Sequence, residues 1–427
     1  MVTPTPIPDH HRSRNPSRSD LGGARTHALR RRTSRRGRGH PTWPGPLLSA
    51  ALVVLGVSAG HAVVSTDPAG AALPESTSSL TVAAPGTSAF DGDAPDPDVV
   101  TSGSTSYAFT TGTALGNHIQ VLVDSSGTTT SGWHSTTGRD YGSSALPVVP
   151  SWEQVDTQTS PGVFYWNGHW IMYYDAAQKG YAGDTGHDCL SVATAATLTP
   201  THAVFTDTST GPLVCDTALG GAIDPSPFID RTTGIAYLVW KSNDGGSSRG
   251  ATIWSQQLSA DGMSLVGAPT DLLDQDSVHY SWEATVENPQ LIEQGGVYFL
   301  LFSAGHWDSA SYSEAYVLCR SPTSPCTSAS TTQILTSSSS GWGPAGGSLF
   351  RNRSGRWMLA YAAWRPGCTN YACAGARRLF VGAVTLTFDP TRSVVTTESR
   401  WSRPTGESWP TAILNRAHHP PVNRSHH

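Results

Sequence analysis

Three carboxylic acids of this chain stand one or two residues ahead of a proline. Asp96 and Asp224 are each followed by Pro, and Glu287 is followed by Asn-Pro. A proline fixes its own φ and biases the preceding residue towards extended backbone. Acids that converge on one pocket repel one another, so at least one is expected to have a raised pKa. Glycoside hydrolysis uses this difference, because a protonated carboxyl group donates a proton to the leaving oxygen while an ionised carboxylate activates water.

The segments around these acids belong to a repeat. Each copy has an apolar pair, a glycine turn and an alternating aromatic strand, and the anchor aromatics of the five copies are Tyr107, Trp170, Tyr237, Tyr298 and Trp357. They are spaced 63, 67, 61 and 59 residues apart. No segment shows a sustained helical period, and each copy has room for about four strands. The sequence therefore predicts an all-β fold, a five-bladed β-propeller. A β-helix would need far shorter repeats.

In a propeller the first strand of each blade lines the central channel, so residues that open these strands meet at one mouth. We expect Asp96, Asp224 and Glu287 to converge there from blades one, three and four. Two other interpretations stay open, ordinary Asp-Pro turn chemistry and calcium binding by the same acids. Asp98 competes with Asp96 as the base, and we favour Asp96 because its following proline aligns with the one after Asp224.

The two ends of the chain differ in composition from the repeats. Residues 1–45 carry ten Arg and two Asp, residues 46–59 are apolar, and Ala69-Gly-Ala follows. This order is typical of a secretory signal peptide, whereas a membrane anchor would need about 20 apolar residues. We therefore predict a signal peptide with a long basic n-region at 1–72 and a flexible lead-in at 73–91. The propeller is predicted at 92–395 and a C-terminal tail at 396–427.

Charge and cysteine content are consistent with a secreted, extracellular protein. The net charge is −5 in spite of the basic first 45 residues, so the rest of the chain is acidic and nucleic acid is not expected as a partner. An oxidising compartment would allow three disulfides between cysteines that are close in sequence. These pairs are Cys189 with Cys215, Cys319 with Cys326, and Cys368 with Cys373. No C-x-x-C motif is present, so a zinc site is not favoured.

Together these motifs resemble glycoside hydrolase family 43, the five-bladed arabinanases, arabinofuranosidases and β-xylosidases. The resemblance covers about residues 92–390, and its most specific parts are the runs 220–230 and 237–241. It implies that Asp96 is the general base and Glu287 the general acid. It also implies that Asp224 orients this acid and adjusts its pKa. The implied substrate is a plant-type polysaccharide of the arabinan or xylan class.

Two positions depart from this family. Gly162 replaces an aspartate of blade two, and blade five reads Gly-Pro-Ala-Gly at 343–346 where many members have Gly-Pro-Gly-His. Because that His approaches the substrate or a central ion, its absence gives no support to a structural calcium. No cofactor and no metal are predicted.

The remaining predictions concern binding and stereochemistry. Trp152 and Trp282 are candidate platforms for sugar rings, although tryptophan also packs between propeller blades. Since blade five separates blades one and four, the carboxyl groups of Asp96 and Glu287 are expected to stand roughly 6.5–9.5 Å apart, which predicts cleavage with inversion. We expect a monomer whose partner is a polysaccharide or oligosaccharide, with no membrane association after signal cleavage. The alternatives are a retaining enzyme like invertase or levansucrase and a non-catalytic carbohydrate-binding propeller.

Overall fold

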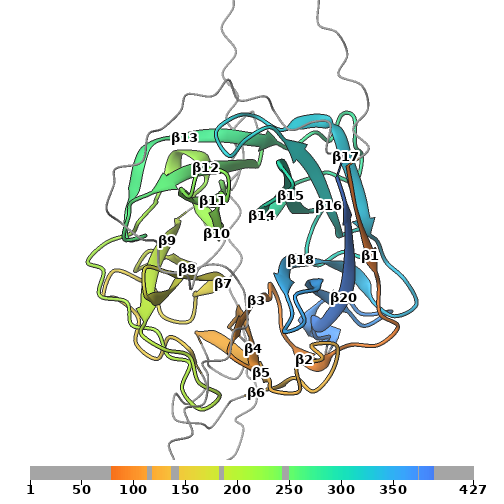
Figure 1. Cartoon of the computed structure of the whole chain (residues 1–427), viewed down its shortest axis with the longest axis horizontal. Helices are drawn as coiled ribbons and strands as arrows, with labels where there is room; N and C mark the ends of the chain where they lie inside the picture. Colours follow the sequence, from red (N-terminus) through yellow and green to blue (C-terminus); the bar gives the residue numbers. More distant parts are fainter. Residues whose placement is uncertain are drawn as a thin grey trace, which may run out of the picture. The chain divides into compact units, whose positions relative to one another are not determined.

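The computed structural model describes residues 78–112, 118–135, 144–181, 187–242, 250–373 and 375–388. The predicted signal peptide and C-terminal tail lie outside these residues. The described residues form five antiparallel sheets around a common centre, which confirms the predicted all-β, five-bladed propeller (Figure 1). Helical structure in this part of the chain is limited to two 3-10 turns, Thr217–Leu219 and Tyr371–Cys373. Neither turn is long and apolar enough to cross a membrane.

In blades one to four the first strand lies nearest the centre and the following strands run outward (Figure 1). Blade one contains β3 (Asp98–Ser102), β4 (Thr105–Thr111), β5 (Ile119–Asp124) and β6 (His134–Ser135). Blade two contains β7 (Thr159–Trp166), β8 (His169–Ala177) and β9 (Asp188–Ala195). Blade three contains β10 (Ala222–Ile229), β11 (Ala236–Ser242), β12 (Thr252–Leu258) and β13 (Leu265–Asp274). Blade four contains β14 (Val286–Gln294), β15 (Val297–Ala304), β16 (Ser313–Cys319) and β17 (Thr327–Leu335).

Blade five joins both ends of the described chain. Its inner strands are β18 (Trp342–Arg351), β19 (Trp357–Trp364) and β20 (Arg378–Thr387), and its outer strand is β1 (Ser79–Ala83). A short strand, β2 (Phe90–Asp93), also pairs with β20. The segment predicted as a flexible lead-in at 73–91 is thus a propeller strand over part of its length. The reason is that β20 would otherwise present an unpaired edge, and Leu80 fills the core beside it.

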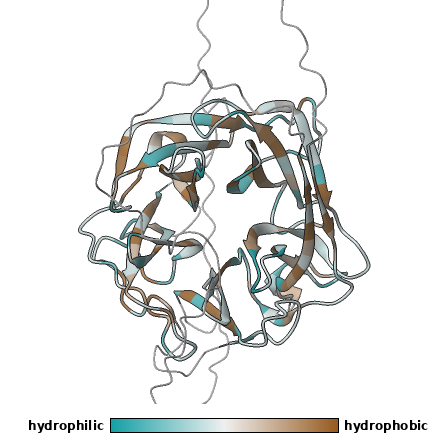
Figure 2. Cartoon of the chain, in the orientation of Figure 1, coloured by the Kyte–Doolittle hydropathy of each residue, from teal (hydrophilic) through white to brown (hydrophobic). Residues whose placement is uncertain are grey.

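The hydrophobic core is divided into five clusters, one at each interface between neighbouring blades. The middle strands supply both faces, because successive side chains of a strand point to opposite sides of its sheet. In β15, Tyr298, Leu300 and Phe302 pack towards blade three, whereas Phe299 and Leu301 pack towards blade five. Strands that are buried on both faces have nearly continuous apolar sequences, as the hydropathy colours show (Figure 2).

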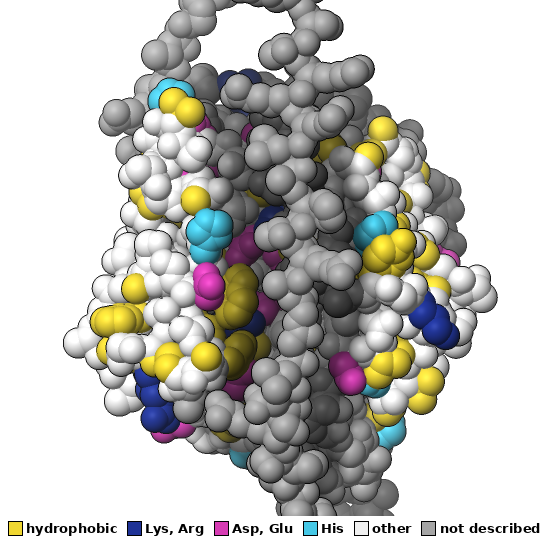
Figure 3. Space-filling model, turned by 180° about the vertical axis from the view of Figure 1, so that it is seen from behind, with side chains coloured by type: hydrophobic (Ala, Val, Ile, Leu, Met, Phe, Trp, Pro, Cys, Tyr) yellow, Lys and Arg dark blue, Asp and Glu magenta, His cyan; other side chains and the backbone are white. Residues whose placement is uncertain are grey.

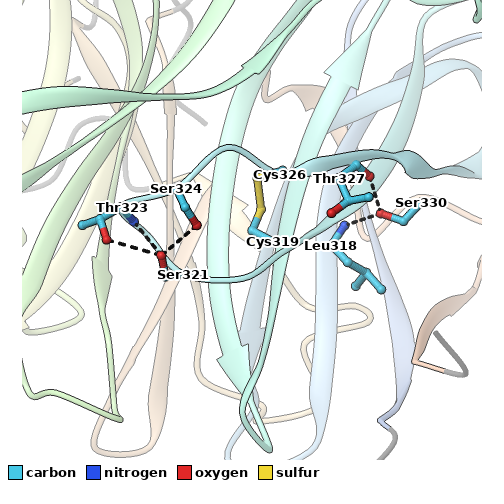
Figure 4. The surroundings of a disulfide bond; sticks show 8 residues. All are labelled: Leu318, Cys319, Ser321, Thr323, Ser324, Cys326, Thr327 and Ser330. Atoms are coloured by element: carbon cyan, nitrogen blue, oxygen red, sulfur yellow. Dashed lines mark hydrogen bonds between the residues drawn. A yellow bond between two sulfur atoms is a disulfide. The ribbon is translucent and has the colours of Figure 1, made fainter. Parts of the chain in front are cut away.

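All three predicted disulfides are present, and the described residues contain no free cysteine. The bond between Cys319 and Cys326 links the end of β16 to the segment before β17 (Figure 4). The loop that it closes is ordered by Ser321, whose Oγ accepts a hydrogen bond from Thr323 N at 3.3 Å. The bond between Cys368 and Cys373 closes a loop between β19 and β20. These bonds confirm the pairing by sequence proximity.

Candidate active site

Five residues with positive φ form a ring where the inner strands begin. They are Asp96, Ser160, Asp224, Asn288 and Gly346, with φ of 50°, 47°, 56°, 46° and 66°. In blades two to five the pairing of the first two strands shifts register at this point, as in a β-bulge. A bulge bends its strand and changes the direction in which side chains point, and bulges are common beside active sites. The bulges therefore turn one residue of each of blades two to five towards the centre, and Asp96 takes the corresponding place in blade one, just before β3.

Two sequence-based expectations are wrong at this ring. The proline after Asp96 and Asp224 does not hold these residues in extended backbone, because both have positive φ, Asp224 within a bulge and Asp96 just before β3. The acid of blade four is also not equivalent to the other two. Asn288 occupies the ring position, and Glu287 lies one residue earlier, paired with Ser303 before the register shift.

Side chains from the second strand of the preceding blade hold most of this ring in place. The shared contact is a hydrogen bond donated by the backbone N–H of the ring residue. Ser160 donates to Thr111 Oγ1 at 3.0 Å, Asp224 to Asp175 Oδ1 at 3.0 Å, and Gly346 to Ser303 Oγ at 2.7 Å. Positive φ is unfavourable for residues other than glycine, so it persists only where surrounding contacts fix it.

Blade three departs from this arrangement because its second-strand residue is Lys241, which has no acceptor. Lys241 Nζ instead makes an ion pair with Glu287 Oε2 at 2.9 Å, and both side chains are largely buried. The N–H of Asn288 donates to Asp224 Oδ2, also at 2.9 Å. Lys241 thus provides a cation for Glu287, and Asp224 in its place accepts the hydrogen bond from the backbone N–H of Asn288.

Asp96 is bound by a two-pronged ion pair. Arg377 Nη1 lies 3.0 Å from Asp96 Oδ1, and Nη2 lies 3.3 Å from Oδ2. Thr111 Oγ1 donates a further hydrogen bond to Asp96 Oδ2 at 2.7 Å. A bidentate guanidinium–carboxylate contact fixes the plane of the carboxylate as well as its position. Asp96 is therefore a rigidly oriented acceptor at the edge of the site.

Asp224 and Glu287 share a buried environment in which the acids repel each other and Lys241 attracts both. Burial, and then the neighbouring Glu287 carboxylate, raise the pKa of Asp224 to about 6, against the lowering effect of Lys241. Tyr312 donates its hydroxyl proton to Glu287 Oε1 at 2.7 Å. Burial and the same carboxylate hold the pKa of Tyr312 well above its usual value, so the phenol keeps its proton. Asp96, Asp224 and Glu287 face two cations, Arg377 and Lys241, and one bound proton makes this group of five neutral.

Asn288 connects the three predicted catalytic acids. Its N–H binds Asp224, while its Nδ2 lies 3.5 Å from Asp96 Oδ1 and 3.2 Å from the Tyr312 hydroxyl. The structure therefore brings Asp96, Asp224 and Glu287 together around one residue. Below them lies a small cavity of about 30 Å³, lined by the ring residues and the prolines that follow them. Figure 3 shows acidic, basic and hydrophobic side chains together in a hollow on one face.

Asp98, the competing base, performs a different task. Its Oδ2 accepts a hydrogen bond from the N–H of Val163 in blade two at 2.7 Å. Burial raises the pKa of Asp98 to about 7. Because this carboxyl group joins the inner strands of two blades, its position favours Asp96 as the base.

The two tryptophans predicted as sugar platforms both have protein partners. Trp152 Nε1 donates to Ser209 Oγ at 3.0 Å. Trp282 packs against the core between blades three and four and lies 5.5 Å from the Tyr280 ring. Both side chains are partly exposed, and their sugar-binding role stays a prediction.

Sequence reasoning did not assign a role to Lys241, Tyr312 or Arg377. Lys241 carried a signal, since it is one of two lysines in the chain and stands in the most specific motif. Tyr312 and Arg377 lie in loops without a motif, so only the fold reveals them.

The departures from the family pattern in blades two and five also have structural reasons. A Cβ added to Gly346 would lie 3.0 Å from Asp96 Oδ1, and a Cβ added to Gly162 would lie 2.2 Å from Pro225 O. Both positions therefore leave little room for a side chain.

Comparison with known proteins places this site in a family. A model of the glycosyl hydrolases family 43 matches residues 89–391. Over 118 residues the chain is 34% identical to the beta-D-galactofuranosidase xynD of Aspergillus niger, and the matched stretch is 27% of this chain and 30% of that protein. The chain thus spans less than a third of that relative's length.

Solved structures show the same fold. An endo-1,4-beta-xylanase from Bacteroides thetaiotaomicron has a TM-score of 0.53 at 20% identity, over 71% of this chain and 97% of that one. A family 43 endo-arabinanase from Bacillus licheniformis has a TM-score of 0.51 at 20% identity, over 70% of this chain and 96% of that one. The fold and the cluster of acids define a propeller glycoside hydrolase. Since the family model spans most of the propeller, the chain belongs to glycosyl hydrolases family 43.

Proposed function

We propose that this enzyme hydrolyses O-glycosidic bonds of a plant-type polysaccharide of the arabinan or xylan class, with inversion, outside the cell. The observation that carries the proposal is that Asn288 binds Asp224 through its backbone N–H, while its side chain contacts Asp96 and the Tyr312 hydroxyl, which in turn binds Glu287. The substrate class follows from the likeness to proteins described as an endo-xylanase and an endo-arabinanase. Three disulfides are in keeping with an oxidising compartment.

The proposed reaction needs two proton transfers. Glu287, in its protonated form, donates a proton to the oxygen of the leaving sugar as the bond between the anomeric carbon and that oxygen breaks. Asp96 accepts a proton from a water molecule whose oxygen forms the new bond to the anomeric carbon. Asp224 holds Asn288 and, through it, the backbone beside Glu287. Each carboxyl group then exchanges protons with solvent to complete the cycle.

The contacts between the two working carboxyl groups support inversion. From Asp96 to Asn288 to Tyr312 to Glu287, the successive polar contacts are 3.5, 3.2 and 2.7 Å. Two side chains thus stand between the acid and the base. This arrangement is in keeping with the roughly 6.5–9.5 Å of inverting enzymes, which leaves room for water.

The test combines a substrate screen with product stereochemistry. Release of reducing ends is measured on arabinan, xylan and sucrose, and nitrophenyl arabinofuranoside, xyloside and galactofuranoside identify the sugar. The galactofuranoside is included because of the similarity to the Aspergillus niger protein. Proton NMR of the first product should show the anomer opposite to that of the substrate. Cleavage of sucrose with retention would support the invertase-like alternative, and binding without cleavage the non-catalytic one.

Export has a separate test. If the signal peptide is functional, N-terminal sequencing of protein from the culture medium should return a start between about 60 and 75. A mature protein that begins before residue 46 would contradict secretion by this route.

A further inference from the structure

Arg377 connects the predicted base to an aromatic side chain outside the acid cluster. Its guanidinium group makes the two contacts to Asp96, and its central carbon lies 5.2 Å from the ring centre of Trp307. Trp307 is 39% exposed. A partly exposed indole thus lies one guanidinium group away from the carboxylate that is predicted to activate water.

Trp307 belongs to a cluster of three rings. It stacks on Trp364 with ring centres 6.0 Å apart, and Tyr371 lies 6.2 Å from Trp307 and 5.0 Å from Trp364. Trp364 is fully buried, and its Nε1 donates to the backbone oxygen of Trp307 at 2.8 Å. Tyr371 is 47% exposed. The cluster therefore has a buried floor and two rings that reach the surface.

The strand pairing places this cluster at the same mouth as the acids. Val286, beside Glu287, pairs with Ala304 at the end of β15, and Trp342 pairs with Trp364 at the end of β19. The loop at 305–312 carries Trp307, and the loop at 365–377 carries Tyr371. Both loops thus leave their strands at the end of the propeller where the inner strands begin.

A disulfide and two hydrogen bonds restrain the loop that carries Tyr371. The disulfide between Cys368 and Cys373 closes it. The Tyr371 hydroxyl donates to Asp93 Oδ2 at 3.2 Å, and the N–H of Arg377 donates to Asp93 Oδ1 at 2.8 Å. Asp93 therefore fixes the aromatic ring and the cation together. A preorganised surface loses little conformational entropy when it binds.

We propose that Trp307 and Tyr371 form a subsite for a sugar unit of the substrate, next to the sugar whose bond is cleaved. Exposed aromatic rings beside an enzyme's polar centre provide the flat apolar surface on which the C–H face of a sugar packs, while its hydroxyls stay in water. The fixed loop and the continuity with Asp96 through Arg377 assign these rings to the substrate. This inference rests on the proposed function and names one of its binding residues.

The test compares substrates of different length in ring variants. For Trp307→Ala and Tyr371→Ala, kcat/KM should fall by about tenfold more on an oligosaccharide than on the nitrophenyl monosaccharide, mainly through KM. Tyr371→Phe keeps the ring and should retain most of the oligosaccharide affinity. The matched control is Tyr165→Ala, because Tyr165 is 50% exposed but lies five residues along β7 from its ring residue, towards the far turn.

Binding without turnover separates this inference from the proposed function. In a Glu287→Gln background, retardation by polysaccharide in native gels should weaken in the Trp307 and Tyr371 variants and not in the Tyr165 variant. Equal losses on short and long substrates, or unchanged retardation, would overturn the subsite. Absence of cleavage by the unmodified enzyme would overturn the proposed function and leave the binding result to decide the subsite. If Trp307→Ala does not fold, Tyr371→Ala decides the outcome, since its ring lies at the surface.

Discussion

The backbone N–H of Asn288 donates a hydrogen bond to Asp224 Oδ2 at 2.9 Å, from one blade to the next. At the equivalent place the other described contacts use Thr111, Asp175 and Ser303 as acceptors from the second strand. Blade three has Lys241 there, and this lysine binds Glu287. The backbone beside Glu287 is thus supported by a carboxylate that also belongs to the acid cluster.

The role of Glu287 can be tested by its amide. Glu287→Gln should lower kcat by about 10²–10⁴-fold on polysaccharide, because the leaving oxygen loses its proton donor. Activated aryl glycosides need no proton and should be affected much less. Steady-state kinetics on both substrate types measure the ratio. Equal losses on both would show that Glu287 is not the acid.

Asp96→Asn should reduce the cleavage of both substrate types, because every substrate needs an activated water. The expected loss in kcat is again about 10²–10⁴-fold. Circular dichroism would show whether the fold persists without the ion pair to Arg377. Full activity on either substrate type would exclude Asp96 as the base and reopen the case for Asp98.

Two variants of Asp224 separate its charge from its hydrogen bond. Asp224→Asn keeps an acceptor for Asn288, whereas Asp224→Ala leaves that N–H unpaired. We expect the alanine variant to lose about 10²-fold in kcat, and the asparagine variant less, since small displacements of an acid are costly. Burial and the neighbouring Glu287 raise the pKa of Asp224 to about 6, so both variants should also change the pH dependence of kcat/KM near that value. Equal losses of kcat in the two variants would contradict a role through Asn288.

Stability is expected to fall as the pH rises above 5. Burial raises the pKa of Glu314 from 4.5 to about 8, so between these values the native state binds more protons than the unfolded chain. Between pH 4.5 and about pH 8, Glu314 therefore lowers the free energy of unfolding by up to about 1.4 kcal/mol for each unit of pH increase. Denaturant unfolding at pH 5.5 and pH 8.5 measures the fall, and Glu314→Gln should reduce it. Asp308→Asn, an exposed acid at the surface, serves as the control.

Removal of β1 should open blade five. Protein that starts at residue 84 lacks the outer strand and Leu80, which is 2% exposed, so β20 keeps an unpaired edge. The loss of this buried leucine alone should cost about 2–5 kcal/mol. Thermal unfolding of this protein is compared with one that starts at residue 78 and retains β1. Equal Tm values would show that β1 contributes nothing to the closure.

The sequence by itself determined the fold class and indicated which three acids lie close together. The near-constant spacing of Tyr107, Trp170, Tyr237, Tyr298 and Trp357 sufficed for five blades, because each repeat is a local unit. The disulfides could be paired for the same reason, since their partners are close in sequence. The repeat also showed that Asp96, Asp224 and Glu287 would meet, although the position of β1 could not be read from it. That strand pairs with β20, which lies at the other end of the propeller sequence.

Only the tertiary structure decided the geometry of the site. Asp96 and Asp224 have positive φ, against the local preference of a residue before proline, and for Asp224 a bulge and a hydrogen bond to Asp175 in the neighbouring blade fix that conformation. The one-residue offset of Glu287 from Asn288 depends on the register between β14 and β15. Arg377 reaches Asp96 from a loop that is 281 residues away in sequence. Contacts over such separations depend on how the blades close around the centre, and no local pattern encodes them.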